Sequence, residues 1–134
     1  MNKICPCGST RPYNECCGLI INAEKNADTC VELMRSRYTA FTTADADYLM
    51  RSHARETRLL KDLRGIKKWA ESVQWMGLII LNTLHGDVSD QIGYVEFRAL
   101  YMEKGKVQQI HENSLFKREN GKWVYVSGVH FEEK

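Results

Sequence analysis

The chain has 134 residues, of which 43% are hydrophobic and 27% charged, and its formal net charge is +2. This length and composition suit one soluble globular domain with a small appendage. The mild charge gives no reason by itself to expect a nucleic-acid-binding protein. The longest apolar run, residues 75–81, is too short to cross a bilayer, so we expect no membrane span.

Four of the five cysteines fall within the first 18 residues, as a C-x-C pair and a C-C pair separated by eight residues. Four thiolates suit a closed tetrahedral zinc site, whose role is structural because no coordination position stays open. Gly8 and Gly18 each follow a pair, where a chain that wraps an ion needs left-handed backbone or close approach. The predicted ligands of one structural Zn²⁺ are Cys5, Cys7, Cys16 and Cys17.

Two other uses of these thiols compete with zinc binding, namely disulfides and thiols with no joint role. A bridge between adjacent Cys16 and Cys17, or across Cys5 and Cys7, strains ordinary disulfide geometry. The first residues also lack the apolar segment of a secretory signal. We therefore expect the reducing cytoplasm, where disulfides are rare.

The residues after the cysteine segment predict helices first. We place a domain boundary near residue 22, which gives a zinc knuckle over 1–22 and a body over 23–134. Thr29 and Glu32 form a capping-box pattern, and apolar residues at helical spacing predict a helix from about 29 to 42. A second short helix is expected over 45–50. Residues 51–72 are rich in arginine and lysine and keep helical periodicity.

The second half of the chain changes to the period of two that is typical of strands. We expect strands at 74–83, which reads as buried on both faces, and at 91–103, 107–117 and 122–127. Lys104-Gly105 and Asn120-Gly121 are hairpin signals. Helices followed by an antiparallel meander indicate an α+β fold.

The cysteine segment, with Ser9 and Tyr13, resembles the SEC-C motif, which is named for the zinc-binding tail of the SecA preprotein translocase. The rest of the chain is similar to the YchJ-like family of uncharacterised bacterial proteins. This resemblance implies a zinc knuckle followed by an NTF2-like (cystatin-like) cone, in which helices pack on a curved antiparallel sheet. It implies no established activity. The matching segments are 33–41, 45–49, 75–78, 112–116 and 119–123.

Strand alternation singles out Glu112 and Ser114, which share a strand face with Phe116. If Phe116 faces the core, a carboxylate is carried inward and must find a partner, because desolvating it alone costs several kcal/mol. Arg35 and Arg37 flank the apolar face of the first helix and are the expected partners. The simpler interpretation is an ion pair that fixes the helix on the sheet.

The functional interpretation of the same residues is a pocket at the open end of the cone, with Glu112 as a base. His53 could reach its mouth, whereas His111 and His130 are taken as structural or exposed. No carboxylate dyad or Ser-His-Asp set emerges from the spacing, so the sequence favours a non-enzyme. The pocket candidates are Arg35, Arg37, Trp75, Tyr101, Glu112 and Ser114.

Two functional hypotheses follow. In the first, which the closed zinc site favours, the protein is a macromolecule-binding or adaptor module that docks through the loop 9–14, with Arg11 and Tyr13 as contacts. The SecA tail contacts an export chaperone, so the resemblance implies a protein or ribosome-associated partner. The basic stretch could contact nucleic acid, but interleaved acids make a solvated face the simpler interpretation. The alternative is a small-ligand-binding protein or acid–base enzyme with its site inside the cone. This fold is also compatible with a homodimer that forms through an open face of the sheet.

Overall fold

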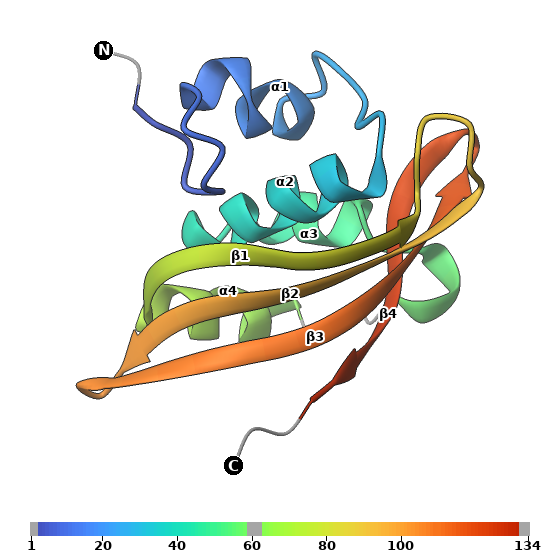
Figure 1. Cartoon of the computed structure of the whole chain (residues 1–134). Coiled ribbons are helices and arrows are strands. Elements are labelled where there is room, and N and C mark those ends of the chain that lie inside the picture. Colours follow the sequence, from blue (N-terminus) through green and yellow to red (C-terminus); the bar gives the residue numbers. More distant parts are fainter. Residues whose placement is uncertain (1–2, 59–62, 132–134) are drawn as a thin grey trace.

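The computed structural model describes residues 3–58 and 63–131. It has three layers (Figure 1): the N-terminal segment with α1 (Cys17–Ile21) lies on α2 (Cys30–Thr42), and α2 lies on a four-stranded sheet. The other helices are α3 (Ala46–Arg51) and α4 (Leu63–Ser72). Single 3₁₀ turns form at Tyr13–Glu15 and Arg55–Thr57. The α+β fold predicted from the sequence is confirmed.

Side-chain caps define where the two central helices begin. Thr29 Oγ1 accepts a hydrogen bond from the Glu32 backbone N–H at 3.2 Å, as the capping pattern predicts. Glu32 Oε1 accepts from the Asp28 N–H at 3.3 Å, one residue before the expected partner. Asp45 Oδ1 caps α3 through the Tyr48 N–H at 3.0 Å. Both predicted helices are therefore confirmed within one residue at each end.

The sheet is an antiparallel meander in the order β1-β2-β3-β4. Its strands are β1 (Gln74–His85), β2 (Ile92–Glu103), β3 (Lys106–Glu119) and β4 (Lys122–His130). The turn pairs Lys104-Gly105 and Asn120-Gly121 have φ values of 52° and 78° and of 52° and 79°. Both pairs are therefore left-handed, as tight hairpins of this type require. Register shifts interrupt β1 against β2 twice and β3 against β4 once.

The main core lies between α2 and the inner face of the sheet. Leu33, Met34 and Tyr38 pack against Val95 and Phe97 of β2, and all five are at most 6% exposed. Burial of side chains of this size stabilises the fold by about 1.5–3 kcal/mol each. α2 is thus held on the sheet by its apolar face, which leaves its other side for the N-terminal segment.

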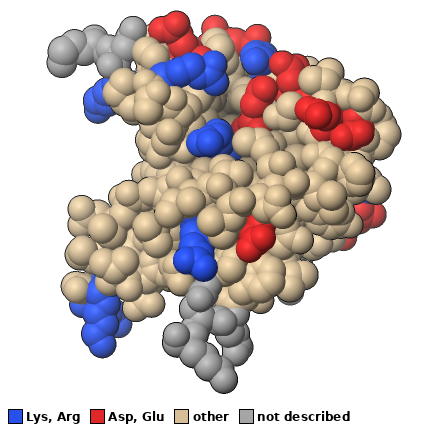
Figure 2. All heavy atoms as spheres, viewed as in Figure 1, with Lys and Arg blue, Asp and Glu red and all other residues tan. Residues whose placement is uncertain are grey.

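The prediction that the first strand is buried on both faces is wrong. β1 is an edge strand, and helices cover only the inner face of the sheet (Figure 1). Met76, Ile79 and Leu84 are consequently 46–55% exposed. In the view of Figure 2, charged side chains are sparse over the sheet and more frequent over the upper layers. An apolar sequence run here indicates a strand with one open apolar face.

The predicted helical stretch over 51–72 is only partly helical. Arg51 ends α3, residues 55–57 form a 3₁₀ turn, and α4 begins at Leu63. Residues 59–62 lie outside the described part of the chain. Among the described residues, no helix combines the length and apolarity needed to cross a membrane.

Candidate metal centre and neighbouring cavities

The two cysteine pairs come together in the N-terminal segment. Cys5 and Cys7 lie in a loop whose ends are joined by the Cys5 N–H to Arg11 carbonyl bond at 2.8 Å. Cys16 and Cys17 lie at the start of α1. The four Sγ atoms all lie within 4.8 Å of one another, and every one of the four residues is at most 7% exposed. The chain thus builds a compact buried group of four sulfurs.

This arrangement fits one four-coordinate ion. A tetrahedral site with Zn–S bonds of about 2.3 Å separates its sulfurs by about 3.8 Å, and Cys7 Sγ lies 3.6 Å from Cys16 Sγ. All five cysteines of the chain are free thiols, so the disulfide alternative is not found. With every ligand position taken by a buried sulfur, such a site has no room for substrate.

Crowding shifts the pKa values of these thiols in opposite directions. Hydrogen bonds with Cys17 and Cys5 lower the pKa of Cys7. The pKa of Cys17 is raised, because it shares hydrogen bonds with Cys5 and Cys7 and is desolvated. Four buried sulfurs cannot all carry negative charge together unless a cation lies among them. The donor set therefore suits a soft divalent ion.

Local backbone geometry explains both glycines of the motif. Gly8 has φ +88°, in the left-handed region. A Cβ on Gly18 would lie 2.7 Å from the Tyr13 carbonyl oxygen and 2.8 Å from the Tyr13 ring. The two predicted reasons for glycine, left-handed backbone and close approach, therefore each hold at one position.

Residues 3–21, which carry the four cysteines and are called the metal segment below, are fixed to the body by two arginines. Arg35 Nη1 of α2 donates to the Cys7 carbonyl at 2.6 Å, and Arg51 Nη2 of α3 donates to the Ile21 carbonyl at 2.7 Å. Cys5 Sγ also lies 3.6 Å from Thr39 Oγ1 of α2. Arg35, expected as a partner of Glu112 and as a pocket residue, lies at the metal segment instead. Its place on the side of α2 that faces the cysteine loop explains the difference.

The two residues predicted to contact a partner have structural contacts of their own. Arg11 is exposed, and its Nη2 lies 3.8 Å from Cys16 Sγ. Ser9 Oγ lies 3.1 Å from the same sulfur. Tyr13 is half-buried against Gly18. Both residues therefore support the cysteine segment, and their role toward a partner stays a prediction.

A cavity of about 270 Å³ lies inside the cone, between α2 and the inner face of the sheet. Arg37, Trp75, Glu112 and Ser114 line it. Tyr101 is not one of the residues that line it, and its ring lies 5.6 Å from that of Trp75. The structure thus brings together four of the six pocket candidates, and their functional role stays a prediction.

Glu112 is 7% exposed, and its partners differ from the expected arginine. Ser114 Oγ and Tyr125 Oη donate to Oε2, the latter at 3.2 Å. His130 Nε2 lies 3.1 Å from Oε1. Arg37 instead donates from Nη1 to the Leu49 carbonyl and Ser52 Oγ, at 2.9 and 2.7 Å. Within the described residues, the predicted helix-to-sheet ion pair with Arg35 or Arg37 is not found.

Neighbouring groups complete the lining of this cavity. The Arg37 guanidinium lies 4.6 Å from the Tyr125 ring centroid, and burial lowers the pKa of Arg37 to about 10. Burial and the nearby Glu112 raise the pKa of Tyr125. The His53 ring stands edge-on to Tyr125 at 5.1 Å. His53 therefore lines the cavity, as the sequence suggested.

Sequence reasoning missed the part of His130 and Tyr125 in this group. The last strand was expected to end at Ser127, but β4 continues to His130 and pairs it with Glu112. The sequence signal for this arrangement is the glycine at position 128. A Cβ on Gly128 would overlap the Glu112 carboxylate, so only glycine leaves room for that side chain. His111 faces the outer side, with Nε2 2.7 Å from Glu96 Oε2.

Comparison with known families accounts for both parts of the chain. The SEC-C motif matches residues 1–19, and the family described as "YchJ, middle NTF2-like domain" matches residues 29–128. The chain belongs to the YchJ family. The predicted membership is confirmed, and the exact domain boundary near residue 22 stays a prediction. Nothing in this family membership assigns an activity.

Relatives of this YchJ-family chain resemble it over nearly its whole length. The UPF0225 protein GSU1048 of Geobacter sulfurreducens is 39% identical over 128 residues, which cover 96% of this chain and 80% of that protein. The solution structure of RPA3114, a SEC-C motif containing protein from Rhodopseudomonas palustris, is 32% identical with a TM-score of 0.85 and covers 98% of this chain and 100% of that one. A SEC-C motif containing protein from Psychrobacter arcticus shares the fold, at 24% identity, a TM-score of 0.81 and coverage of 98% and 85%.

Proposed function

We propose that this protein is a zinc-stabilised module that binds another protein through a groove beside its SEC-C knuckle. The observation that carries the proposal is the closed group of four buried sulfurs, because a site without an open position serves structure rather than chemistry. Zinc is the ion that four thiolates in this spacing suit best. Binding of such an ion contributes on the order of 10 kcal/mol to the folding of small domains.

The surroundings of the knuckle support a docking role. Its inner side is tied to α2 and α3 through Arg35 and Arg51. A groove of about 400 Å³ lies between the knuckle and the C-terminal end of α2, lined among others by Ile4, Pro6 and Thr43. Ile4 is 62% exposed. A groove held rigid before binding loses less entropy when a partner inserts apolar side chains. We expect a protein partner that offers such side chains.

Substitution of Ile4 tests this proposal more cleanly than substitution of Arg11, which touches Cys16 Sγ. We expect the immobilised Ile4→Glu variant to lose capture of the protein partner that the immobilised wild type captures. Val88→Glu is the matched control, because Val88 is 68% exposed in the turn between β1 and β2. Metal content by elemental analysis should equal wild type in both. Undiminished capture of the same partner by Ile4→Glu contradicts the proposal.

The cavity inside the cone supports a second candidate function, the binding of a small organic molecule. Its walls are mostly apolar, with Glu112, Arg37 and Tyr125 as converging polar groups, which is typical of ligand sites. A thermal-shift screen of small acids and carbonyl compounds tests this candidate. A ligand of this cavity should lose its effect in Gly128→Ala, which displaces the Glu112 carboxylate. If no compound raises the melting temperature of wild type, the candidate fails.

A further inference from the structure

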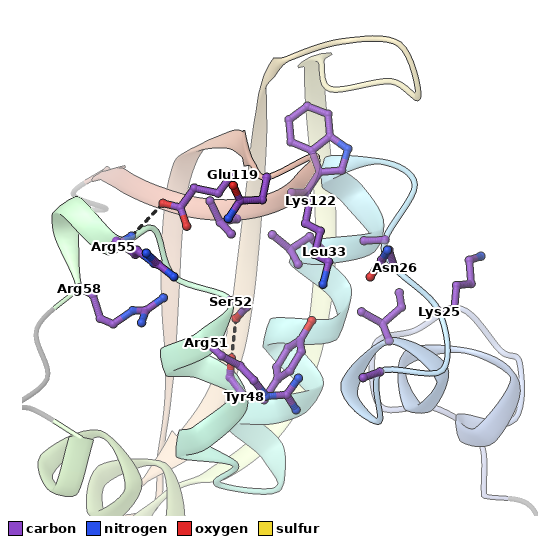
Figure 3. Close-up of a pocket in the computed structure, with 16 residues that line it drawn as sticks. Lys25, Asn26, Leu33, Tyr48, Arg51, Ser52, Arg55, Arg58, Glu119 and Lys122 are labelled. Atoms are coloured by element: carbon purple, nitrogen blue, oxygen red, sulfur yellow. Dashed lines mark hydrogen bonds between the residues drawn. The ribbon is translucent and has the colours of Figure 1, made fainter.

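A third cavity, of about 400 Å³, shares no lining residue with the groove at Ile4 or with the cavity inside the cone. The segment after α1, the end of α3, the 3₁₀ turn at Arg55–Thr57 and the β3–β4 hairpin enclose it (Figure 3). Its charged lining residues are Lys25, Arg51, Arg55, Arg58, Glu119 and Lys122. Three of the arginines from the basic stretch of the sequence thus meet at one place.

Positive charge in this cavity is largely uncompensated. Lys25, at the edge, lies 3.6 Å from Asp28 and 3.5 Å from Glu32. Within residues 3–58 and 63–131, no acidic side chain forms an ion pair with the other four cationic side chains, which are Arg51, Arg55, Arg58 and Lys122. Like charges that share a cavity raise its potential and attract an anion.

Neutral groups hold two of the guanidinium groups in place. Arg58 donates from Nε and Nη2 to the His53 carbonyl, at 3.2 and 2.7 Å. Arg51 donates from Nη2 to the Ile21 carbonyl at 2.7 Å, and its Cζ lies 4.8 Å from the Tyr48 ring centroid. Each group is oriented without being neutralised. Each also keeps further N–H donors, since a guanidinium carries five.

Among the described residues that line the cavity, Glu119 is the one carboxylate, and it is held at one wall. Glu119 Oε2 accepts a hydrogen bond from the Arg55 backbone N–H at 2.9 Å (Figure 3). This bond fixes the acid through a backbone N–H, and within the described part of the chain no ion pair joins Glu119 to the Arg55 side chain. Leu33, Trp123 and Val124, all at most 6% exposed, supply an apolar wall. The cavity therefore offers several cationic donors beside a surface suited to a carbon skeleton.

We propose that this cavity binds a small organic anion with at least two negatively charged oxygens, such as a phosphate ester or a polycarboxylate. Planar guanidinium groups match the oxygens of both classes in two-point hydrogen bonds. The volume of the cavity falls within the range of about 300–1,000 Å³ that is usual for small-molecule sites. The site is independent of the knuckle surface and of the cone interior, so its failure would leave both functional proposals intact.

Calorimetric titration of the full chain with pyrophosphate and with citrate at low salt tests the proposal. We expect one of them to bind with a Kd below about 1 mM. The double variant Arg58→Gln/Lys122→Gln should weaken that binding at least about tenfold, because two charged hydrogen bonds are lost. The matched control Lys104→Gln/Lys106→Gln removes the same net charge at the exposed β2–β3 hairpin and should keep the wild-type Kd within about twofold.

The relative affinities of the two probes assign the class of anion. Tighter pyrophosphate binding indicates phosphate esters, and tighter citrate binding indicates polycarboxylates. The proposal is overturned if neither probe binds below about 1 mM. It is also overturned if both double variants weaken binding equally, since that outcome reflects net charge alone. Circular dichroism of each variant verifies folding, which we expect because Lys122 is exposed and Arg58 half-buried.

Discussion

Glu112 illustrates how a single side chain depends on several elements. Its carboxylate stays inside the sheet because Ser114, Tyr125 and His130 surround it with hydrogen-bond partners. A buried carboxylate without such partners would cost several kcal/mol. Gly128 on the neighbouring strand leaves the space that the side chain needs. The residue therefore reflects the register of β3 against β4 as much as its own chemistry.

His53 gives a pH-dependent prediction at the same scale. Burial lowers its pKa, and the cations Arg37 and Arg58 lower it further, with a smaller opposing effect of Glu119. In the unfolded chain a histidine has a pKa of about 6.5. Below that pH the unfolded state binds more protons than the folded state, so the free energy of unfolding falls as the pH falls.

We therefore expect His53→Gln to reduce the loss of melting temperature between pH 7.5 and pH 5.5, measured with zinc in excess (both values bracket the unfolded pKa of about 6.5). His85→Gln is the control, because His85 is exposed at the end of β1. It should keep the wild-type pH dependence. An unchanged slope in His53→Gln would show that this imidazole titrates normally in the fold.

At the scale of elements, α2 joins the other parts of the molecule. Its apolar face packs on the sheet, while Arg35 on its other side donates to the Cys7 carbonyl. Trp123 of β4 adds a contact at the start of this helix, where its Nε1 donates to the Asp28 carbonyl at 3.1 Å. The position of the metal segment thus depends on where α2 begins and how it is rotated.

Loss of the helix cap should be measurable. Thr29→Ala removes the acceptor for the Glu32 N–H and should lower the free energy of unfolding by about 1 kcal/mol. Thr29→Ser keeps the hydroxyl and should stay within a few tenths of a kcal/mol of wild type. Urea unfolding followed by circular dichroism provides both values. Equal losses in the two variants would indicate that the methyl group, rather than the cap, is responsible.

At the scale of the whole molecule, the three layers depend on one another unequally. The sheet and α2 share a core of ordinary size. The N-terminal layer has few large apolar residues of its own, and its buried cluster is centred on the four cysteines and Ile21. A segment this small needs a staple such as a metal ion to stay folded. We expect its order to depend on the bound ion.

Chelation tests that dependence through thiol reactivity. Before chelation, iodoacetamide should modify none of the five cysteines quickly, since all are buried. After chelation, Cys5, Cys7, Cys16 and Cys17 should react. Cys30 should lag, because it is 1% exposed and burial raises its pKa to about 11. Intact mass then shows four adducts, one for each cysteine of the cluster. Four adducts before chelation would contradict a bound ion.

Local sequence was sufficient for α2, α3, the two tight hairpins and the grouping of the four cysteines. The cap at Thr29 and the two left-handed hairpin pairs are decided by residues within four positions of each other. Cys5, Cys7, Cys16 and Cys17 lie within one short segment, so their spacing alone predicts that their sulfurs meet. Local backbone preferences and short loops require little information from the rest of the chain.

The tertiary structure decided which side chains face one another in the cavities. Which partner reaches Glu112 depends on the register shift between Leu115 and Phe116, which brings His130 opposite it. Whether Arg35 faces the cone or the knuckle depends on the rotation of α2. Arg58 and Lys122 meet only because the turn after α3 lies beside the β3–β4 hairpin. Contacts between residues far apart in the chain depend on how whole elements pack, and no local pattern records that packing.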